Sequence, residues 1–386
     1  MKILHVCLAN FYIDNYAYQE NMLPKFHKLS GHEVTIIASM ESFDKNGNAC
    51  LLEKSGEYIN EYGIPVIRLN YRKPVKVNRL LRLYEDWYHH LARIKPDIIF
   101  IHGCQFLDIK VVTKYLSQNR DVKVFVDNHA DFSNSAKSFI SRNILHKLIW
   151  RKCANIINKY ALKFYGVLPA RVDFLINVYK IPPNKVKLLV MGADDEKVSE
   201  TRQPGVRKII REKYSISEDD FLIITGGKID NYKKQTLLLM QAVNNIDNPK
   251  LKLVVFGSIV EDLQKSVYEL CNERVKYIGW VNASDVYKYF AASDLVVFPG
   301  RHSVFWEQAT GLGVPMVVKY WEGTTHVDLG GNCKFLYSDS VSEITDIIKQ
   351  IVEDSELYEK MKTIASTKGM EVFSYRKISE RSISIM

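Results

Sequence analysis

Long apolar runs and paired cysteines are both missing from this sequence. Its 386 residues contain no apolar segment of the roughly 18 residues that a membrane-spanning helix requires. The opening Met1-Lys2 leads into an apolar run, ILHVCL, that is too short for a secretory signal. The six cysteines form no CxxC pair, so we expect reduced thiols rather than a disulfide framework. These absences predict a cytoplasmic protein.

Several catalytic signatures are also absent. The chain has no GxSxG elbow, no Walker A loop, no HExxH helix and no GxGxxG after its first apolar run. These absences argue against an α/β-hydrolase, a P-loop enzyme, a zinc peptidase and a site for NAD or FAD at that position. No helix-turn-helix, zinc or RNP-like signature accompanies the basic residues, so we expect no nucleic-acid partner.

The charge is unevenly distributed along the chain. Residues 1–190 contain 28 lysines and arginines against 16 acids, whereas residues 191–386 contain 25 against 28. The net charge is therefore +12 for the first part and −3 for the second, which sums to the +9 of the whole chain. A basic first half predicts an anionic partner for that half.

Near-continuous apolar runs alternate with amphipathic stretches along the chain. Such runs are typical of parallel strands that are covered on both faces. The predicted strands are Ile3–Leu8, Val34–Ala38, Val66–Leu69, Ile98–Ile101, Val124–Val126, Val186–Val190, Phe221–Thr225, Leu251–Phe256, Val275–Ile278, Leu295–Phe298, Met316–Val318 and Lys334–Tyr337. The predicted helices are Tyr18–Leu29, Arg79–Ile94, Ile109–Leu116, Lys233–Asn245, Val260–Cys271, Asp285–Ala292 and Val341–Asp354. We predict an α/β protein with Rossmann-like domains at 1–192 and 193–357, and a C-terminal helix at 358–386 that packs across their junction.

The segment from Leu295 to Lys319 has the pattern of one βαβ unit: an apolar run, a polar loop, a short helix and a second apolar run. In such units ligands bind at the carboxyl ends of the strands. Glu307, in the first turns of the helix, is placed to accept a hydrogen bond from a sugar or ribose hydroxyl. The amides of Ser303, Val304 and Phe305 are placed to cradle a phosphate.

Two glycines and two lysines follow the first strand of the predicted second domain. Gly226-Gly227 allows a tight turn and the close approach of a ligand. Lys228 at the strand tip and Lys233 at the next helix are placed to reach one anion, and a departing diphosphate needs such charge. The alternative is a glycine turn with solvated lysines.

Polar residues follow two strands of the predicted first domain. Asp127, His129 and Asp131 come after Val124–Val126, where a histidine faces the ligand crevice and can bind a sugar hydroxyl or a phosphate. Their spacing matches no strong metal signature, so we expect no metal, and a locally hydrogen-bonded histidine is the alternative. A second group follows the first strand and is a candidate for acceptor binding: Asn10, Tyr12, Asp14 and Asn15. For Asp14 and Asn15, capping of the next helix is the favoured alternative.

Two basic stretches contain no acid. The first is Arg68–Arg82, and the second runs from Phe132 to Val172 with its basic residues at Lys137–Lys163. The second stretch interleaves its basic residues with Phe139, Leu148 and other apolar residues, which predicts a basic amphipathic helix at an anionic membrane surface. The alternative is a solvated helix face.

Taken together, these residues resemble the retaining glycosyltransferases of the GT-B fold, family four, over nearly the whole chain. The segment Glu307-Gln308-Ala309-Thr310, ending in Gly313-Val314-Pro315, is similar to the family's Glu-Ala-x-Ala helix, whose Glu binds the ribose. Gly227-Lys228-Ile229 and Lys233 look like the family's diphosphate-binding Gly-Arg-Leu and Lys. Gly279-Trp280-Val281 resembles the segment whose backbone reads the base, and His129 resembles the histidine that contacts the donor sugar.

Two departures from the family pattern stand out. The first Glu of the family, eight residues before the second, is absent, and His302 in the shorter loop is a candidate to hold the sugar hydroxyls instead. The N-terminal loop also lacks the family's Gly-Gly pair.

The resemblance implies transfer of a sugar from a UDP- or GDP-type donor to a saccharide or lipid-linked acceptor in surface polysaccharide biosynthesis. Lys228, Lys233 and His129 would be the catalytic residues. No cofactor or DxD-bound metal is expected, because the chain has no DxD. The protein would be cytoplasmic and peripheral at the inner face of the membrane. The alternatives are a nucleotide-sugar epimerase of the same fold and a non-catalytic nucleotide-sugar-binding protein.

Overall fold

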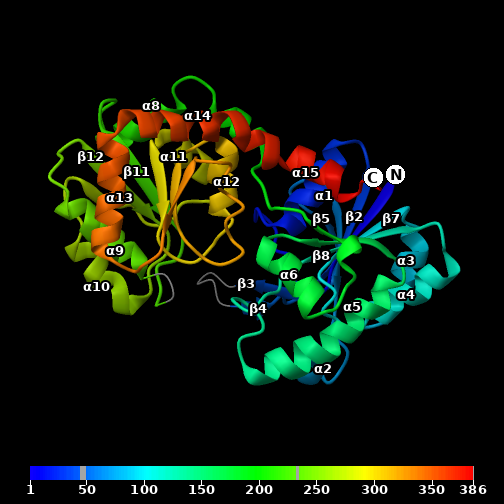
Figure 1. Cartoon of the computed structure of the whole chain (residues 1–386). Helices are drawn as coiled ribbons and strands as arrows, with labels where there is room; N and C mark the ends of the chain where they lie inside the picture. The colour runs from blue at the N-terminus through cyan, green and yellow to red at the C-terminus, as the bar shows by residue number, and fades with distance from the viewer. Residues whose placement is uncertain (44–48, 232–233, 386) are drawn as a thin grey trace. The chain divides into compact units, whose positions relative to one another are not determined.

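The structure is a computed structural model that describes residues 1–43, 49–231 and 234–385 (Figure 1). It forms two compact units: unit 1 comprises Met1–Met191 and Ile378–Met386, and unit 2 comprises Gly192–Lys377. The chain therefore leaves unit 1 and returns to it within its last helix. Among the described helices, none has both the length and the apolar character needed to span a membrane. The predicted α/β class with two Rossmann-like units is confirmed.

A sheet of eight strands forms the centre of the described part of unit 1, in the order β10-β9-β8-β7-β1-β2-β6-β5. All neighbours pair in parallel except β5, which is antiparallel to β6. The strand β7 is buried throughout, as expected for an apolar run covered on both faces. The strands are β1 Lys2–Cys7, β2 Glu33–Ser39, β5 Gly56–Ile59, β6 Pro65–Leu69, β7 Ile98–His102, β8 Lys123–Asn128, β9 Ala161–Gly166 and β10 Val186–Leu188. A separate antiparallel pair is formed by β3 Glu41–Phe43 and β4 Ala49–Leu51.

The helices of unit 1 cover this sheet and enclose a core that contains Trp87, Trp150 and Phe106. They are α1 Gln19–Leu29, α2 Val75–Leu81, α3 Tyr88–Ile94, α4 Ile109–Gln118, the π-helix η1 Ser141–Trp150, α5 Arg151–Asn158, α6 Pro169–Asn177 and the 3-10 turn η2 Pro183–Lys185. The last helix, α15 Tyr375–Ser382, begins in unit 2 and ends in unit 1.

Unit 2 contains an all-parallel sheet of six described strands in the order β13-β12-β11-β14-β15-β16. The strands are β11 Phe221–Gly226, β12 Leu251–Phe256, β13 Val275–Tyr277, β14 Leu295–Phe298, β15 Met316–Lys319 and β16 Cys333–Leu336. The helices are α7 Asp195–Thr201, α8 Val206–Lys213, α9 Gln235–Asn245, α10 Glu261–Glu269, α11 Val286–Ala292, α12 Phe305–Leu312, α13 Val341–Glu353 and α14 Ser355–Val372. Helices α9 and α13 pack together, and α11 packs against α8 and α12 (Figure 1).

The strand order of unit 2 reverses between β11 and β14. Chain progression runs outward from β11 through β12 to β13 on one side, and from β14 through β15 to β16 on the other. The connections after β11 and β14 therefore run to opposite sides of the sheet, and in sheets of this kind ligands bind at the carboxyl ends of these two strands. This switch point positions the candidate site.

Three sequence predictions about elements were wrong. The helix expected over Arg79–Ile94 is two helices, because α2 ends where Arg82 adopts a left-handed conformation with φ 55°. The basic stretch from Phe132 to Val172 is helical only in η1, α5 and the start of α6, and β9 lies within it. The C-terminal segment expected as one helix at 358–386 is divided between α14 and α15.

Candidate functional site

Helix α12 is held firmly at the carboxyl end of β14. The ring of Phe305, its first residue, lies with its centroid 5.7 Å from those of Phe256 and Phe290. Near the other end, Gly369 of α14 approaches so closely that a Cβ there would lie 2.2 Å from the Thr310 carbonyl oxygen. Aromatic packing and this glycine contact therefore fix where the side chains of α12 point.

Glu307 is fully buried in the first turn of α12, and two histidines bind it. His302 Nε2 and His326 Nε2 each donate to Glu307 Oε1 at 2.7 Å. His326 lies in the loop after β15, so loops from neighbouring strands meet on one carboxylate. Burial raises the pKa of Glu307, but the charge and hydrogen bond of His302 and the hydrogen bond of His326 outweigh it and hold the pKa well below its usual range. Glu307 is therefore ionised.

Several polar atoms at or beside this carboxylate are buried without a hydrogen-bond partner among the described residues. They are Trp306 Nε1, Glu307 Oε2, Gln308 Oε1 and His326 Nδ1. An unpartnered buried polar atom costs about 1–3 kcal/mol, so a ligand that bonds to such atoms gains affinity there. The first turn of α12 is therefore the strongest candidate binding position in unit 2.

The same three side chains raise the question of a metal ion. His302, Glu307 and His326 bring ligand atoms within 4.8 Å of one another. Because both Nε2–H groups donate to one carboxylate oxygen, hydrogen bonds already account for the arrangement. No metal is assigned to this group.

Two glycines, Gly226 at the end of β11 and Gly257 after β12, are explained by close contacts within the protein. A Cβ on Gly226 would lie 2.1 Å from the ring of Phe256. A Cβ on Gly257, in the loop after β12, would lie 2.0 Å from the Gly227 carbonyl oxygen. Glycine is therefore required at these positions for the neighbouring strand ends to approach each other, whether or not a ligand binds.

Of the two candidate lysines after β11, Lys228 and Lys233, only Lys228 is among the described residues. Lys228 is exposed directly after β11, the strand that pairs with β14. Lys233 lies outside the described residues, and α9 begins after it at Gln235. The diphosphate-binding roles of Gly227, Lys228 and Lys233 stay predictions.

Two backbone segments were also assigned to the donor. In Gly279-Trp280-Val281 the Gly279 carbonyl already accepts from the Gly257 amide at 2.7 Å, and the Trp280 side chain is 68% exposed. No side chain of the described residues caps the start of α12, near the amides of Ser303, Val304 and Phe305. Base reading by the first segment and phosphate binding by the second stay predictions.

In unit 1, His129 follows the end of β8 and lies beside two carboxylates. Its Nε2 is 3.2 Å from Asp127 Oδ2 and 3.7 Å from Glu20 Oε1. Burial lowers the pKa of His129, but Glu20 and then Asp127 raise it more, so the net shift is upward. Asp131 is not part of this group, because it pairs with Arg171 at 3.2 Å. Contact between His129 and a donor sugar stays a prediction.

A metal ion does not fit this group of unit 1. Glu20, His102 and His129 bring ligand atoms within 4.8 Å of one another. However, both ring nitrogens of His102 have hydrogen-bond partners, His5 Nδ1 at 2.9 Å and Asp127 Oδ2 at 2.8 Å. His102 therefore has no nitrogen left for a metal.

The N-terminal loop is built differently from the prediction. Tyr12 is fully buried and its hydroxyl accepts from Asn60 Nδ2 at 2.8 Å, so its side chain belongs to the core rather than to an acceptor site. Asp14 accepts from Tyr58 at 2.7 Å, and the Asn15 amide donates to Glu61 at 2.8 Å. Neither Asp14 nor Asn15 caps α1, whose N-cap is Tyr18, so the capping prediction was wrong.

Asn10 remains a candidate for acceptor binding. It is half-buried, and its Nδ2 is buried without a partner among the described residues.

Part of unit 2 matches a known protein family. Residues 206–368, which include β11, β14 and α12, match the family model described as Glycosyl transferases group 1. This match covers less than half of the chain, so the likeness to the family concerns that segment of unit 2. An uncharacterized glycosyltransferase of Methanocaldococcus jannaschii is 21% identical over 221 residues, which cover 54% of this chain and 55% of that protein. In this match the chain spans about half the length of the curated relative.

Solved structures show that the chain has the GT-B fold. Sucrose-phosphate synthase from Thermosynechococcus elongatus superposes with a TM-score of 0.67 at 12% identity, covering 98% of this chain and 96% of that one. HepE from Anabaena in complex with UDP gives 0.66 at 17% identity, covering 99% and 98%. WaaG, a glycosyltransferase involved in lipopolysaccharide biosynthesis, gives 0.65 at 14% identity, covering 98% of each chain. At these identities the likeness concerns the fold.

Sequence reasoning missed His326 in unit 2, and His102 and Glu20 in unit 1. His326 shares no local motif with Glu307, and only the pairing of β14 with β15 brings it near. His102 and Glu20 were missed for the same reason. The one available signal for His102 was its position at the end of a buried strand, next to the strand that carries Asp127.

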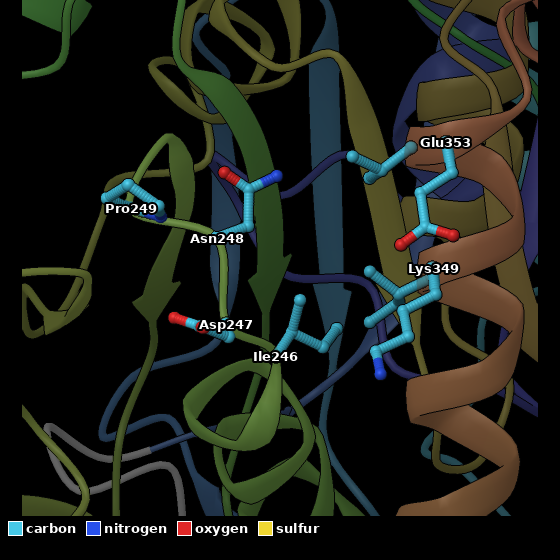
Figure 2. Close-up of a pocket in the computed structure, with 8 residues that line it drawn as sticks. Ile246, Asp247, Asn248, Pro249, Lys349 and Glu353 are labelled. Atoms are coloured by element: carbon cyan, nitrogen blue, oxygen red, sulfur yellow. The ribbon is translucent and has the colours of Figure 1, made fainter.

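A hollow elsewhere in unit 2 does not belong to this site. It measures about 230 Å³ and is lined by residues of the 246–249 loop and of α13, including Asn248, Lys349 and Glu353 (Figure 2). The loop comes directly before β12, so this hollow lies at the amino ends of the strands. Ligands of such sheets bind at the opposite, carboxyl ends.

Proposed function

We propose that this protein transfers a sugar from a nucleotide-diphosphate sugar to a saccharide or lipid-linked acceptor, with retention at the anomeric carbon. The observation that carries the proposal is the buried, ionised Glu307 at the switch point of unit 2. Its Oε1 is occupied by two histidines, and its Oε2 has no partner among the described residues. A carboxylate held in this way suits a ribose hydroxyl, which needs one strong acceptor.

The departing diphosphate requires positive charge near the carboxyl ends of β11 and β14. Lys228 is exposed at the tip of β11, beside β14, and the sequence adds Lys233. The start of α12 adds the positive end of a helix dipole. Loss of one preorganised group of this kind typically lowers the rate by about 10²–10³-fold.

The donor is a UDP- or GDP-type sugar nucleotide in this proposal. Support for the UDP type comes from HepE of Anabaena, which has been solved with UDP and with UDP-glucose. His302 is proposed to face the sugar hydroxyls in place of the family's first Glu. No chain residue is assigned as a covalent nucleophile, and the leaving phosphate is proposed to take the proton from the acceptor.

The acceptor is proposed to lie at an anionic membrane. The supporting feature is a surface around η1 that we call the basic–apolar surface. It combines exposed apolar side chains with basic ones: Phe139, Ile140, Ile144 and Leu148 with Lys137, Arg142 and Lys147. Phe139 is 78% exposed and Leu148 is 64% exposed, although both are apolar. Apolar side chains inserted among headgroups and lysines near anionic lipids would each strengthen binding.

The other basic stretch contributes less than its sequence predicted. Arg68 is buried and donates to the carbonyls of Tyr12 and Ser39. Arg72 pairs with Asp108 at 3.1 Å, and Arg79 pairs with Glu41 at 2.7 Å. Arg72 and Arg79 are therefore partly neutralised by acids from other segments. The basic–apolar surface is left as the main candidate for membrane contact. This surface is also the basis for proposing a cytoplasmic protein peripheral to the inner face of the membrane.

Donor turnover tests the enzymatic proposal. Purified protein is screened with UDP- and GDP-sugars by thermal shift, and the best donor is then incubated with and without membrane extract. We expect slow donor hydrolysis alone and transfer with extract, and Lys228→Ala should lower transfer about 100-fold. Lys265→Ala, on an 87%-exposed side chain of α10, is the matched control and should change little.

The other outcomes separate the alternatives. Release of free nucleotide diphosphate and an altered sugar, with no need for an acceptor, would identify an epimerase. Donor binding without any turnover would identify a binding protein. Turnover of Lys228→Ala within a few-fold of the parent would remove Lys228 from the phosphate site.

Flotation with anionic liposomes at low salt tests the membrane proposal. The double variant Phe139→Ser with Leu148→Ser should lose most of the bound fraction. Ile209→Ser, which removes a 64%-exposed apolar side chain from α8 of unit 2, should not. Equal flotation of all three proteins, or none by the parent, would contradict the proposal.

A further inference from the structure

A continuous row of buried hydrogen bonds runs through unit 1 from α15 to the end of β8. His27 Nε2 lies 3.0 Å from the Ser379 carbonyl oxygen, and His27 Nδ1 lies 3.0 Å from His5 Nε2. His5 Nδ1 lies 2.9 Å from His102 Nε2, and His102 Nδ1 lies 2.8 Å from Asp127 Oδ2. We call these four contacts the histidine row. All three imidazoles are buried to within 1% exposure.

The two ends of the histidine row can only accept hydrogen bonds. At one end stands the carbonyl oxygen of Ser379. At the other stands the carboxylate of Asp127, which also accepts from the Gly103 amide at 3.1 Å and lies 3.2 Å from His129 Nε2. A carboxylate surrounded by donors is stabilised in its ionised form. The pKa of Asp127 is accordingly lowered: burial raises it, but His102 and His129 together outweigh that effect.

A second contact fixes the direction at the α15 end. Ser382 Oγ donates its only proton to the Ser379 carbonyl at 2.7 Å. Toward His27 Nε2, which lies 3.1 Å away, Ser382 Oγ can therefore only accept. His27 Nε2 therefore carries a proton. If His27 is neutral, its Nδ1 has none and must accept from His5 Nε2.

Counting protons along the histidine row then determines the state of His102. The four contacts need four protons, whereas three neutral imidazoles supply only three. His5 and His27 are poor places for the fourth, because each is fully buried among other imidazoles and burial lowers the pKa of both, that of His27 to about 3. His102 is the only one of the three that contacts a carboxylate.

We infer that His102 is a protonated positioning residue whose charge is fixed through His27 and His5 by the acceptors of α15. As an imidazolium it shares the Asp127 carboxylate with His129. The charge on Asp127 is thereby partly neutralised, which limits how strongly this carboxylate attracts and protonates His129. The C-terminal helix thus sets the electrostatics around the candidate sugar-contacting histidine. The link to catalysis rests on the proposed function of His129, whereas the protonation of His102 does not.

The inference predicts opposite effects for two substitutions of the same residue. In His27→Gln the amide N–H can donate to Ser379 and the amide oxygen can accept from His5, so four protons are still needed. In His27→Phe only two contacts remain, and two neutral imidazoles satisfy them when His5 reverses its tautomer. His102 should therefore stay an imidazolium in His27→Gln and become neutral in His27→Phe.

Nitrogen NMR of protein labelled with ¹⁵N-histidine measures this directly and needs neither donor nor acceptor. Both ring nitrogens of His102 should resonate as protonated in the parent and in His27→Gln, and one should shift to the unprotonated range in His27→Phe. His89→Phe, at an exposed position, is the control and should leave the His102 signals unchanged. His102 resonances are assigned from their loss in His102→Gln.

Two results would overturn the inference: a neutral His102 in the parent, or equal shifts in His27→Gln and His27→Phe. Transfer kinetics test the catalytic link separately. We expect the turnover number of His27→Phe to fall about tenfold or more while His27→Gln stays closer to the parent. An unchanged turnover number together with the expected NMR shifts would leave the protonation of His102 intact and would remove its role in positioning His129.

Discussion

Replacing Glu307 by Gln removes one negative charge from the buried site and little else. The two hydrogen bonds from His302 and His326, both 2.7 Å long, would then end on a neutral oxygen. Hydrogen bonds to charged groups contribute about 1.5–3 kcal/mol and neutral ones about 0.5–1.5, so each bond weakens by about 1 kcal/mol. We expect a loss of about 2 kcal/mol in the free energy of unfolding of unit 2. That corresponds to a Tm lower by about 4–8 °C.

The same substitution should weaken donor binding, because the oxygen at the Oε2 position becomes an NH₂ group. Loss of one charge-assisted hydrogen bond to a ribose hydroxyl corresponds to about tenfold in Kd or more. Differential scanning fluorimetry measures Tm, and calorimetric titration with the nucleotide diphosphate measures Kd. Glu322→Gln makes the same chemical change at an exposed position of unit 2 and should leave both values unchanged. If Glu307→Gln matches the parent in Tm and Kd, neither the ion pair nor the ribose contact exists as described.

The pH dependence of this effect has a definite sign. The pKa of Glu307 is lowered in the folded protein, so its contribution is complete above the pKa of the unfolded chain, near 4.3. The contribution is lost as pH falls through the lower folded value. The Tm difference between the parent and Glu307→Gln should therefore be largest near neutral pH and should shrink below about pH 4.

Further predictions concern residues outside that carboxylate. Gly257→Ala should lower stability by at least about 2 kcal/mol in a denaturant titration, because φ is +127° and the new Cβ would lie 2.0 Å from the Gly227 carbonyl oxygen. Tyr12→Phe should lower stability by about 1 kcal/mol, since Asn60 loses its acceptor. The turnover number should stay within about twofold. A large loss of turnover at unchanged Tm would instead favour acceptor binding by Tyr12. The pKa of His27 is lowered from 6.5 to about 3 by burial, so the unfolded chain binds the extra proton between these values and stability falls as pH falls through that window. His27→Gln should lack this loss, which amounts to as much as about 5 kcal/mol, so the stabilities of the two proteins in an acid titration should diverge below about pH 6. Parallel acid titrations would mean that His27 is not buried.

The sheet of unit 2 could be predicted because its strands are near-continuous apolar runs. Leu295–Phe298 and Met316–Lys319 lie where expected, and so does the helix that carries Glu307. Local sequence suffices there, since burial on both faces selects the same residue types in every strand. The glycine turn after β11 could also be located from the sequence, but its steric reason could not, because the Gly227 carbonyl meets Gly257 in the loop after another strand.

The rest depended on contacts between distant segments. The break between α2 and α3 has no glycine or proline to mark it. It is set by Asp108, which accepts from the Tyr84 amide at 2.7 Å, and by Leu8, whose carbonyl accepts from the Tyr84 hydroxyl at 2.6 Å. His326 reaches Glu307 only because β15 pairs with β14. No spacing rule in one sequence can reveal such partners, because they are neighbours only after the sheet has formed.

The return of Ile378–Met386 to unit 1 has a consequence for how this chain is made. A ribosome delivers Met1–Met191 first, then all of unit 2, and only afterwards the serines that accept from His27. During synthesis the nascent unit 1 therefore lacks the acceptor of His27 until Ile378–Met386 has been translated. We expect unit 1 to reach full resistance to proteolysis only after Ile378–Met386 has left the ribosome, so that its maturation is timed by a segment translated after unit 2 rather than by its own length.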